Sequence, residues 1–221
     1  MLFSLWSAKA GAGCTAIAVG LADELAARVG AALLVDAAGD VPACVGLSDG
    51  IDGFTDWLAA VSTPIEALRR LEVEVGPRGV SLLPMGSSEL WSEARVETLL
   101  QLLRHEQRPV VVDVGHVPAS SRMCAEVLRG RLVAEADQSF LVSRACYLSM
   151  RRALASPLRS NGVILLREAG RSLDAIDVAR ILELPVVAQV DHDPVVSRAL
   201  DSGTFARRVP RGFARQLKGV A

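Results

Sequence analysis

The chain has 221 residues, of which 51% are hydrophobic and only 4% aromatic, and its formal net charge is −1. This length suits one α/β domain whose core is built mainly from alanine, valine and leucine. The near-neutral charge argues against a dedicated nucleic-acid-binding protein, and no apolar run approaches the roughly 20 residues of a membrane-spanning helix.

The cysteines form neither a disulfide framework nor a metal-binding pattern. There is no C-x-x-C pair among Cys14, Cys44, Cys124 and Cys146, and no metal-like spacing with the three histidines. They therefore indicate small apolar residues in a reducing compartment. Because the first six residues lack the basic region of a signal peptide, we expect a cytoplasmic protein.

Short apolar runs alternate with longer helix-like segments along the chain. Several runs are rich in β-branched residues and too short for helices, which predicts strands at 2–6, 32–36, 80–83, 110–114, 139–142, 163–166 and 186–190. Helices are expected at 15–28, 53–60, 64–71, 89–105, 119–130, 146–155, 172–183 and 193–202. This alternation predicts an α/β fold with a doubly wound, mostly parallel sheet flanked by helices. The irregular segment 42–79 is expected to elaborate that domain.

The first predicted strand leads into a glycine-rich turn and a helix, the context that a phosphate loop requires. Residues 9–15 read Lys-Ala-Gly-Ala-Gly-Cys-Thr, whose turn and helix start can cradle an anion with backbone amides. In the usual pattern, G-x-x-x-x-G-K-[ST], Gly13 and Thr15 match the last glycine and the hydroxyl. Cys14 stands in the place of the lysine, and Lys9 lies at the front of the loop. The loop alone fits a tight turn without a ligand equally well.

Two carboxylates lie at the ends of predicted strands. Asp36 ends the strand at 32–36, and Asp113 lies near the end of the strand at 110–114, two residues before Gly115. Ligands of open α/β sheets bind beyond the carboxyl ends of the strands. Alone, each aspartate fits a turn or a helix cap. Together with Thr15, in this order, they predict a Mg²⁺ site.

The order of these motifs resembles the MinD/ParA family of P-loop ATPases, of the SIMIBI class, over nearly the whole chain. A lysine at the front of the loop resembles the deviant Walker A motif, K-G-G-x-G-K-[ST]. Residues 33–40 resemble the family's switch I segment, residues 112–115 its Walker B and switch II segment, and residues 184–196 its L-P-v-l-g-x-I-P-x-D-P-x-V stretch.

The resemblance implies the same fold and a site for ATP and Mg²⁺. Its cofactor-binding residues would be Lys9, Gly11, Gly13, Cys14 and Thr15, and its Mg²⁺ ligands Thr15, Asp36 and Asp113. In the family, the front lysine crosses a nucleotide-sandwiched dimer to contact the partner's phosphates. A homodimer, or a heterodimer with an intact paralogue, is therefore expected.

The departures from the family pattern fall at functional positions. Cys14 removes a cation from the triphosphate, which is worth a few kcal/mol in partly shielded surroundings. Ala38 replaces the second aspartate of D-x-D, which helps to position the attacking water, so Asp36 and Asp40 are the remaining candidates for catalytic residues. The pairs 167–168 and 190–191 stand where the family has adenine-contacting residues. Together these changes predict a degenerate site with weak or absent ATP binding and little or no ATPase activity.

Two functions follow from the resemblance. The first is a spatial organiser or scaffold for a pilus, division or partition machine. Within the family, the members with altered Walker boxes resemble the CpaE/TadZ proteins, which localise pilus machinery. The alternative is an active ATP-dependent dimerising switch. Related amidoligase or reductase-ATPase branches need further catalytic or cluster-ligating residues, which the scattered cysteines do not supply.

The last segment, 204–221, is predicted to be a basic tail or helix that follows a P-loop domain at 1–203. It interleaves five basic residues with the apolar side chains Phe205, Val209, Phe213, Leu217 and Val220. Such a stripe fits packing against the domain, or contact with an anionic membrane surface like that of the C-terminal helix of MinD. A smaller basic group, Arg144, Arg151 and Arg152, fits a solvated helix face or contact with DNA or an acidic partner.

Overall fold

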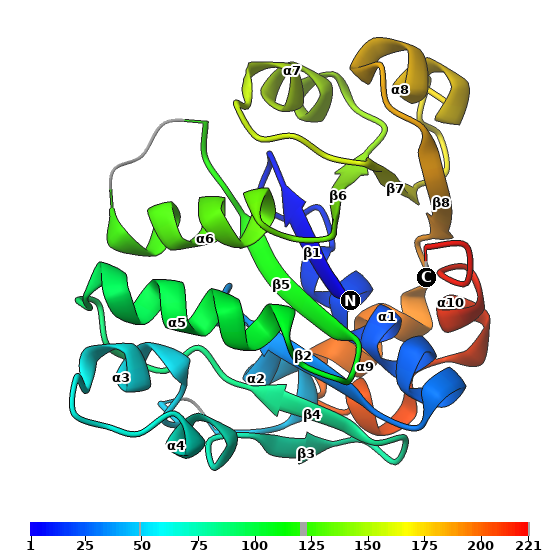
Figure 1. Ribbon diagram of the computed structural model, residues 1–221. Helices are drawn as coiled ribbons and strands as arrows, with labels where there is room; N and C mark the ends of the chain where they lie inside the picture. Colours follow the sequence, from blue (N-terminus) through cyan, green and yellow to red (C-terminus); the bar gives the residue numbers. More distant parts are fainter. Residues whose placement is uncertain (49, 120–122, 221) are drawn as a thin grey trace.

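The computed structural model describes residues 1–48, 50–119 and 123–220. Within these residues, eight strands form one sheet in the order β3-β4-β2-β5-β1-β6-β7-β8 (Figure 1). All neighbouring strands pair in parallel except β3 and β4, which are antiparallel. Their bounds are β1 Leu2–Ser7, β2 Ala32–Asp36, β3 Val73–Val75, β4 Val80–Leu83, β5 Val110–His116, β6 Gln138–Arg144, β7 Gly162–Arg167 and β8 Val186–Asp191.

The predicted doubly wound sheet and its seven predicted strands are confirmed. The central strands β1, β2 and β5 are buried on both faces, as near-continuous apolar runs of a parallel sheet require. The strand that the sequence did not predict is β3, a three-residue edge strand with an exposed Glu74 in its middle. It exists because the turn at 76–79 folds it back on β4.

Helices cover both faces of the sheet. Helices α1, α2, α9 and α10 contribute to the buried cluster on one face, and α3 to α8 contribute to the cluster on the other. Their bounds are α1 Cys14–Val29, α2 Val41–Val45, α3 Phe54–Ala59, α4 Glu66–Arg69, α5 Glu93–Arg104, α6 Cys124–Ala134, α7 Tyr147–Ala155, α8 Ala175–Leu182, α9 Pro194–Asp201 and α10 Arg211–Arg215, with a 3₁₀ turn, η1, at Ala206–Arg208. Residues 120–122 of the helix expected at 119–130 lie outside the described residues. Among the described residues, no helix is both long and apolar enough to cross a bilayer.

The C-terminal segment packs into the core of the sheet's α1 side. Phe205, Phe213, Leu217 and Val220 are all buried there. The rings of Phe205 and Phe213 meet edge to face with centroids 5.7 Å apart. A Cβ on Gly20 of α1 would lie only 2.5 Å from the Phe213 ring, so α1 is shaped to receive this side chain. Of the two alternatives for the apolar stripe, packing against the domain is the one found in the structure.

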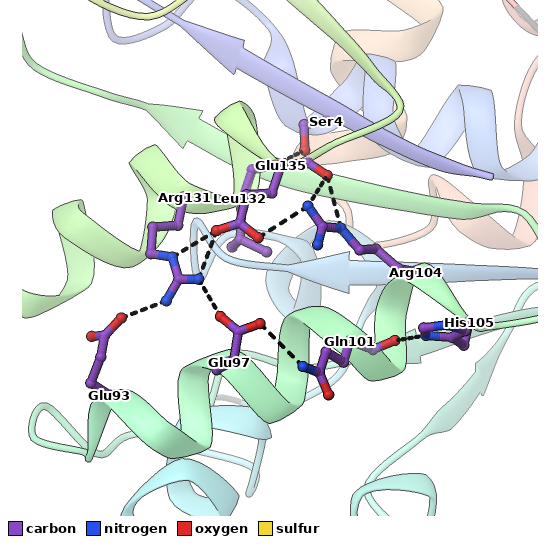
Figure 2. Close-up of polar contacts among 9 residues, drawn as sticks. All are labelled: Ser4, Glu93, Glu97, Gln101, Arg104, His105, Arg131, Leu132 and Glu135. Carbon is purple, nitrogen blue, oxygen red and sulfur yellow. Dashed lines mark hydrogen bonds and ion pairs between the residues drawn. The ribbon is translucent and has the colours of Figure 1, made fainter.

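On the opposite face, an ion-pair network joins α5 to α6 (Figure 2). The Arg131 guanidinium lies 2.5 Å from Glu93, 2.7 Å from Glu97 and 2.7 Å from Glu135. Arg104 of α5 also pairs with Glu135, at 3.2 Å. Because one guanidinium is shared by carboxylates from both helices, the network fixes α6 against α5.

Candidate functional site

The loop between β1 and α1 keeps the backbone of an anion cradle. Gly11 and Gly13 have φ values of 74° and 92°, in the left-handed region that favours glycine. The first intrahelical hydrogen bond runs from the Ile17 N–H to the Gly13 carbonyl, at 3.1 Å. The amides of residues 14–16 therefore precede the helix ladder and lie at the positive end of a 16-residue helix. This is the geometry that binds phosphate groups in other proteins.

The Cys14 side chain turns into the protein. Its thiol donates a hydrogen bond to the Leu5 carbonyl, 3.1 Å away, and the residue is only 6% exposed. Burial, with the nearby negative charge of Asp113, raises the pKa of the Cys14 thiol well above its ordinary value. The thiol is therefore neutral at physiological pH, and this position offers no cation to a bound phosphate.

Lys9 is half-buried at the front of the loop. Its ammonium donates to the adjacent Ala10 carbonyl at 3.4 Å, and it pairs with no carboxylate in the described part of the chain. It lies on the side of the loop that faces the start of α7. There, although burial opposes the change, the Ser149 hydroxyl and the charges of Lys9 and Arg171 lower the pKa of Cys146.

Asp113 is fully buried in the middle of β5, where it pairs in register with Asp36, the last residue of β2. Its Oδ1 accepts the Gly115 N–H at 3.2 Å, while its Oδ2 has no hydrogen-bond partner among the described residues. Burial and the negative charge of Asp36 raise the pKa of Asp113 to about 7, although the Thr15 hydroxyl and the Cys14 thiol beside it oppose the rise. A buried carboxylate oxygen without a partner favours a proton or a cation, so Asp113 and Thr15 fit a Mg²⁺ site.

Asp36 is occupied by its own loop. Its Oδ1 accepts the N–H groups of Ala38 and Gly39 at 3.1 and 2.7 Å, and its Oδ2 accepts that of Val41 at 3.3 Å. Burial raises the pKa of Asp36 to about 6, although these amides lower it in turn. The structure thus brings Asp36 to the same edge as Asp113, but its oxygens hold the turn into α2.

Asp40, the other candidate catalytic residue, is exposed at the N-cap of α2, where its side chain makes no capping hydrogen bond. It is close enough for its charge to contribute to the raised pKa values of Asp36 and Asp113. Ala38 carries no polar side chain and packs against Gly115, where an added Cβ would meet the Ala38 Cβ at 2.7 Å. The side chains that the turn contributes here are therefore the exposed carboxylate of Asp40 and the methyl group of Ala38.

A further residue reaches this turn from α6. The Arg129 guanidinium donates from Nε to the Ala37 carbonyl at 2.7 Å and from Nη2 to the Ala38 carbonyl at 3.5 Å. The Ala37 N–H donates to the Asp113 carbonyl at 2.8 Å. The turn after β2 is therefore held from three sides. Sequence analysis did not identify Arg129, because nothing in the sequence separates it from the other arginines of that helix.

Ion pairs cross the ends of β7 and β8, where the resemblance locates the adenine-contacting positions. Arg167 lies 2.5 Å from Asp191, its neighbour on β8. Glu168 lies 2.6 Å from Arg144 and also pairs with Arg171. Leu166, at the end of β7, would meet a Cβ on Gly13 at 3.3 Å. On the side of the loop that faces β7 and β8, these ion pairs and the Leu166 side chain therefore lie next to the glycine-rich turn.

A doubly wound parallel sheet with a glycine-rich anion cradle after β1 and paired carboxylates on β2 and β5 defines the P-loop NTPase fold. Among solved structures, the chain is similar to a ParA family ATPase from Chlorobium tepidum TLS, with 18% identity over 98% of this chain and 95% of that one, at a TM-score of 0.76. It is similar to the septum site-determining protein MinD of Pyrococcus horikoshii OT3, solved with Mg-ADP, with 18% identity over 99% and 93% of the chains, at a TM-score of 0.75.

The MinC:MinD cell division protein complex of Aquifex aeolicus gives a similar result, with 20% identity over 99% of this chain and 96% of that one, at a TM-score of 0.73. The chain therefore has the MinD/ParA-like fold, as the motif order indicated. At these identities the likeness establishes the fold. No protein-family model and no curated protein sequence matches the chain.

Proposed function

We propose that this protein is a positioning or scaffold protein with a MinD/ParA-like fold and a degenerate ATP site. One observation carries the proposal: the residue in the place of the phosphate-loop lysine is a buried, neutral thiol that donates to the Leu5 carbonyl. Phosphoryl transfer depends almost entirely on positioning and on stabilising negative charge. A loop without that cation retains the shape of the site and lacks one positive charge beside the phosphates.

The residues present can still hold a nucleotide loosely. The amides of residues 14–16 would bind phosphate oxygens, and Thr15 and Asp113 would hold Mg²⁺. When bound, Mg²⁺ would neutralise negative charge on the phosphates. The ends of β6, β7 and β8 would present the Arg144–Glu168 and Arg167–Asp191 pairs to the base. Adenine would have to displace or accommodate these pairs, so we expect weak or absent binding of ATP.

Hydrolysis needs a group that orients the attacking water. Ala38 has none, Asp36 is occupied by three backbone amides, and Asp40 is exposed at the start of α2. We therefore propose that the protein has little or no ATPase activity. It would act by holding a partner at a cellular location, as part of a pilus, division or partition machine in the cytoplasm.

The second candidate function, an ATP-dependent dimerising switch, is favoured by Lys9. This lysine lies at the front of the loop and pairs with no carboxylate among the described residues, so its ammonium is available to an anion that approaches from outside. A second copy carrying ATP, or an intact paralogue, would supply that anion. The resemblance to MinD and ParA proteins assigns this role to the same lysine.

Two measurements on the full chain separate the two functions. Isothermal titration calorimetry with Mg-ATP reports binding, and mass photometry with and without Mg-ATP reports assembly. The scaffold proposal predicts weak or undetectable heat and an oligomeric state that ATP does not change. Tight ATP binding together with dimerisation that requires ATP and is lost in Lys9→Ala would favour the switch instead.

A further inference from the structure

A groove runs between α7 and α8, which lie side by side at the β6–β8 end of the sheet (Figure 1). Its larger part is a cavity of about 850 Å³ with mainly apolar walls that include Met150, Leu154, Leu173 and Ile181. A second cavity of about 370 Å³ shares Leu154 and Ile181 with the first and continues to Leu158. We call the two together the α7–α8 groove.

The same two helices expose large apolar side chains. Among the described residues, they carry five of the thirteen large apolar side chains that are exposed: Tyr147, Leu148, Leu154, Ile176 and Ile181. Tyr147 is 74% exposed and Leu154 62%. Scattered single apolar residues need no explanation, but a cluster beside an apolar groove is typical of an interaction site. This surface therefore has the composition of an interaction site.

The charged side chains that line the larger cavity of the groove are all basic, whereas the second cavity is lined by both Arg159 and Glu183. Arg151 and Arg171 line the larger cavity, and no aspartate or glutamate is among the residues that line it. Arg171 pairs with Glu168, whereas Arg151 and its neighbour Arg152 have no carboxylate partner within 1–48, 50–119 and 123–220. Tyr147, Arg151 and Leu154 follow one another at helical spacing, so the apolar and basic groups share one face of α7.

We propose that the α7–α8 groove binds an acidic amphipathic helix of a protein partner. Such a helix carries apolar anchors at i, i+3, i+4 and i+7. A row of anchors fills an elongated groove better than a compact ligand would. Carboxylates beside those anchors would meet Arg151 and Arg152. A second copy of this chain fits less well, because a two-fold contact would bring Arg151 of one copy toward that of the other. The proposal goes beyond the ATP site and holds whether or not nucleotide binds.

The test is a display selection against the full chain, from a library of helical peptides randomised along one face, followed by fluorescence anisotropy with the enriched peptides. We expect enriched helices that combine leucine-like anchors with Asp or Glu. Leu154→Asp should weaken their binding about tenfold or more. Arg151→Glu should also weaken it, and this variant should prefer a peptide whose Glu residues are changed to Lys.

Arg208→Glu, a charge reversal at an exposed arginine of η1, is the matched control and should leave binding unchanged. Circular dichroism of each variant checks that the fold is intact. Enrichment of basic helices, or binding that Leu154→Asp does not change, would overturn the proposal. So would a selection that enriches nothing while phosphatidylglycerol vesicles bind the chain and lose that binding in Leu154→Asp, because the groove would then be a membrane contact.

Discussion

The Cys14 thiol lies 3.1 Å from the Leu5 carbonyl and donates a hydrogen bond to it. This contact turns the side chain at the lysine position of a phosphate loop away from the cradle and into the core. Burial keeps the thiol neutral. The glycines thus give the loop the backbone shape of a cradle, while the side chain of residue 14 is a neutral thiol.

Restoring the lysine should restore part of the nucleotide affinity. In Cys14→Lys, an ammonium replaces the thiol beside a cradle whose amides already precede the helix ladder, so we expect Mg-ATP to bind about tenfold more tightly or better, from a close charge pair in partly shielded surroundings. Cys14→Met, which changes size without adding charge, is the control. If calorimetry gives Cys14→Lys and Cys14→Met the same affinity for Mg-ATP, the cradle itself does not accept phosphate. Turnover should still require Ala38→Asp in addition.

Arg129 should control the order of the turn after β2. Its guanidinium contacts the Ala37 carbonyl at 2.7 Å, and Ala37 is only 3% exposed. Arg129→Ala leaves this carbonyl without that donor, at a cost of about 1–3 kcal/mol. Hydrogen exchange of the Ala38 and Gly39 amides should accelerate. Arg131→Ala, two residues along, removes contacts to α5 and should leave these amides unchanged; equal acceleration in both variants would contradict the assignment.

The C-terminal segment should behave as part of the core. Phe213 is 3% exposed and lies against Gly20, so Phe213→Ala should reduce the free energy of unfolding by about 3–5 kcal/mol. Arg215→Ala, at an exposed position of the same helix, should change it by about 0.5 kcal/mol or less. Urea denaturation measures both. A Phe213→Ala variant as stable as the parent would mean that the segment is dispensable and free for other contacts.

Asp56 should make stability depend on pH in the acid range. Its carboxylate accepts the Gly53 N–H at 2.9 Å and the Ser88 hydroxyl at 2.8 Å, along with Ser87. Although burial opposes the change, these hydrogen bonds lower the pKa of Asp56 below its ordinary value. A lowered pKa in the folded state contributes stability above the unfolded pKa, which is about 3.9, and the contribution disappears as the pH falls through the folded pKa.

Asp56→Asn should therefore be less stable than the parent at neutral pH, and the difference should shrink below about pH 4. Urea denaturation across the acid range measures this difference. Ser87→Ala removes one of several donors and should give a smaller change of the same sign. A difference between Asp56→Asn and the parent that stays constant with pH would assign the loss to packing alone.

The fold was predictable because its signals are local. Short β-branched runs predicted seven strands, and motif order predicted the MinD/ParA-like arrangement that the solved structures support. The strand β3 was missed because it has only three residues, too few for its apolar–polar alternation to stand out from the irregular segment 42–79. Burial of Phe213 was one of two alternatives, since spacing alone does not show whether an apolar stripe faces a core or a surface.

The location of the site was predictable from the sequence, whereas the contacts that its side chains make were less so. Thr15 was expected from the glycine-rich loop, and Asp36 and Asp113 from strand ends. The structure brings the three together, although Asp113 lies in the middle of β5. The direction of each side chain depends on tertiary contacts: Asp36 turns to three amides of its own loop, and Asp113 keeps one oxygen without a partner. Arg129 comes from a distant helix, and the α7–α8 groove depends on how two helices pack, so neither has a signal in sequence spacing.

The central proposal is that the loop does not drive phosphoryl transfer, and the most direct test is the rate of phosphate release from Mg-ATP by the unmodified full chain. The account predicts a rate equal to that of buffer, because Cys14 supplies no cation and Ala38 orients no water. Steady turnover that is abolished by Lys9→Ala or Asp113→Ala would contradict it and would establish a working ATPase switch.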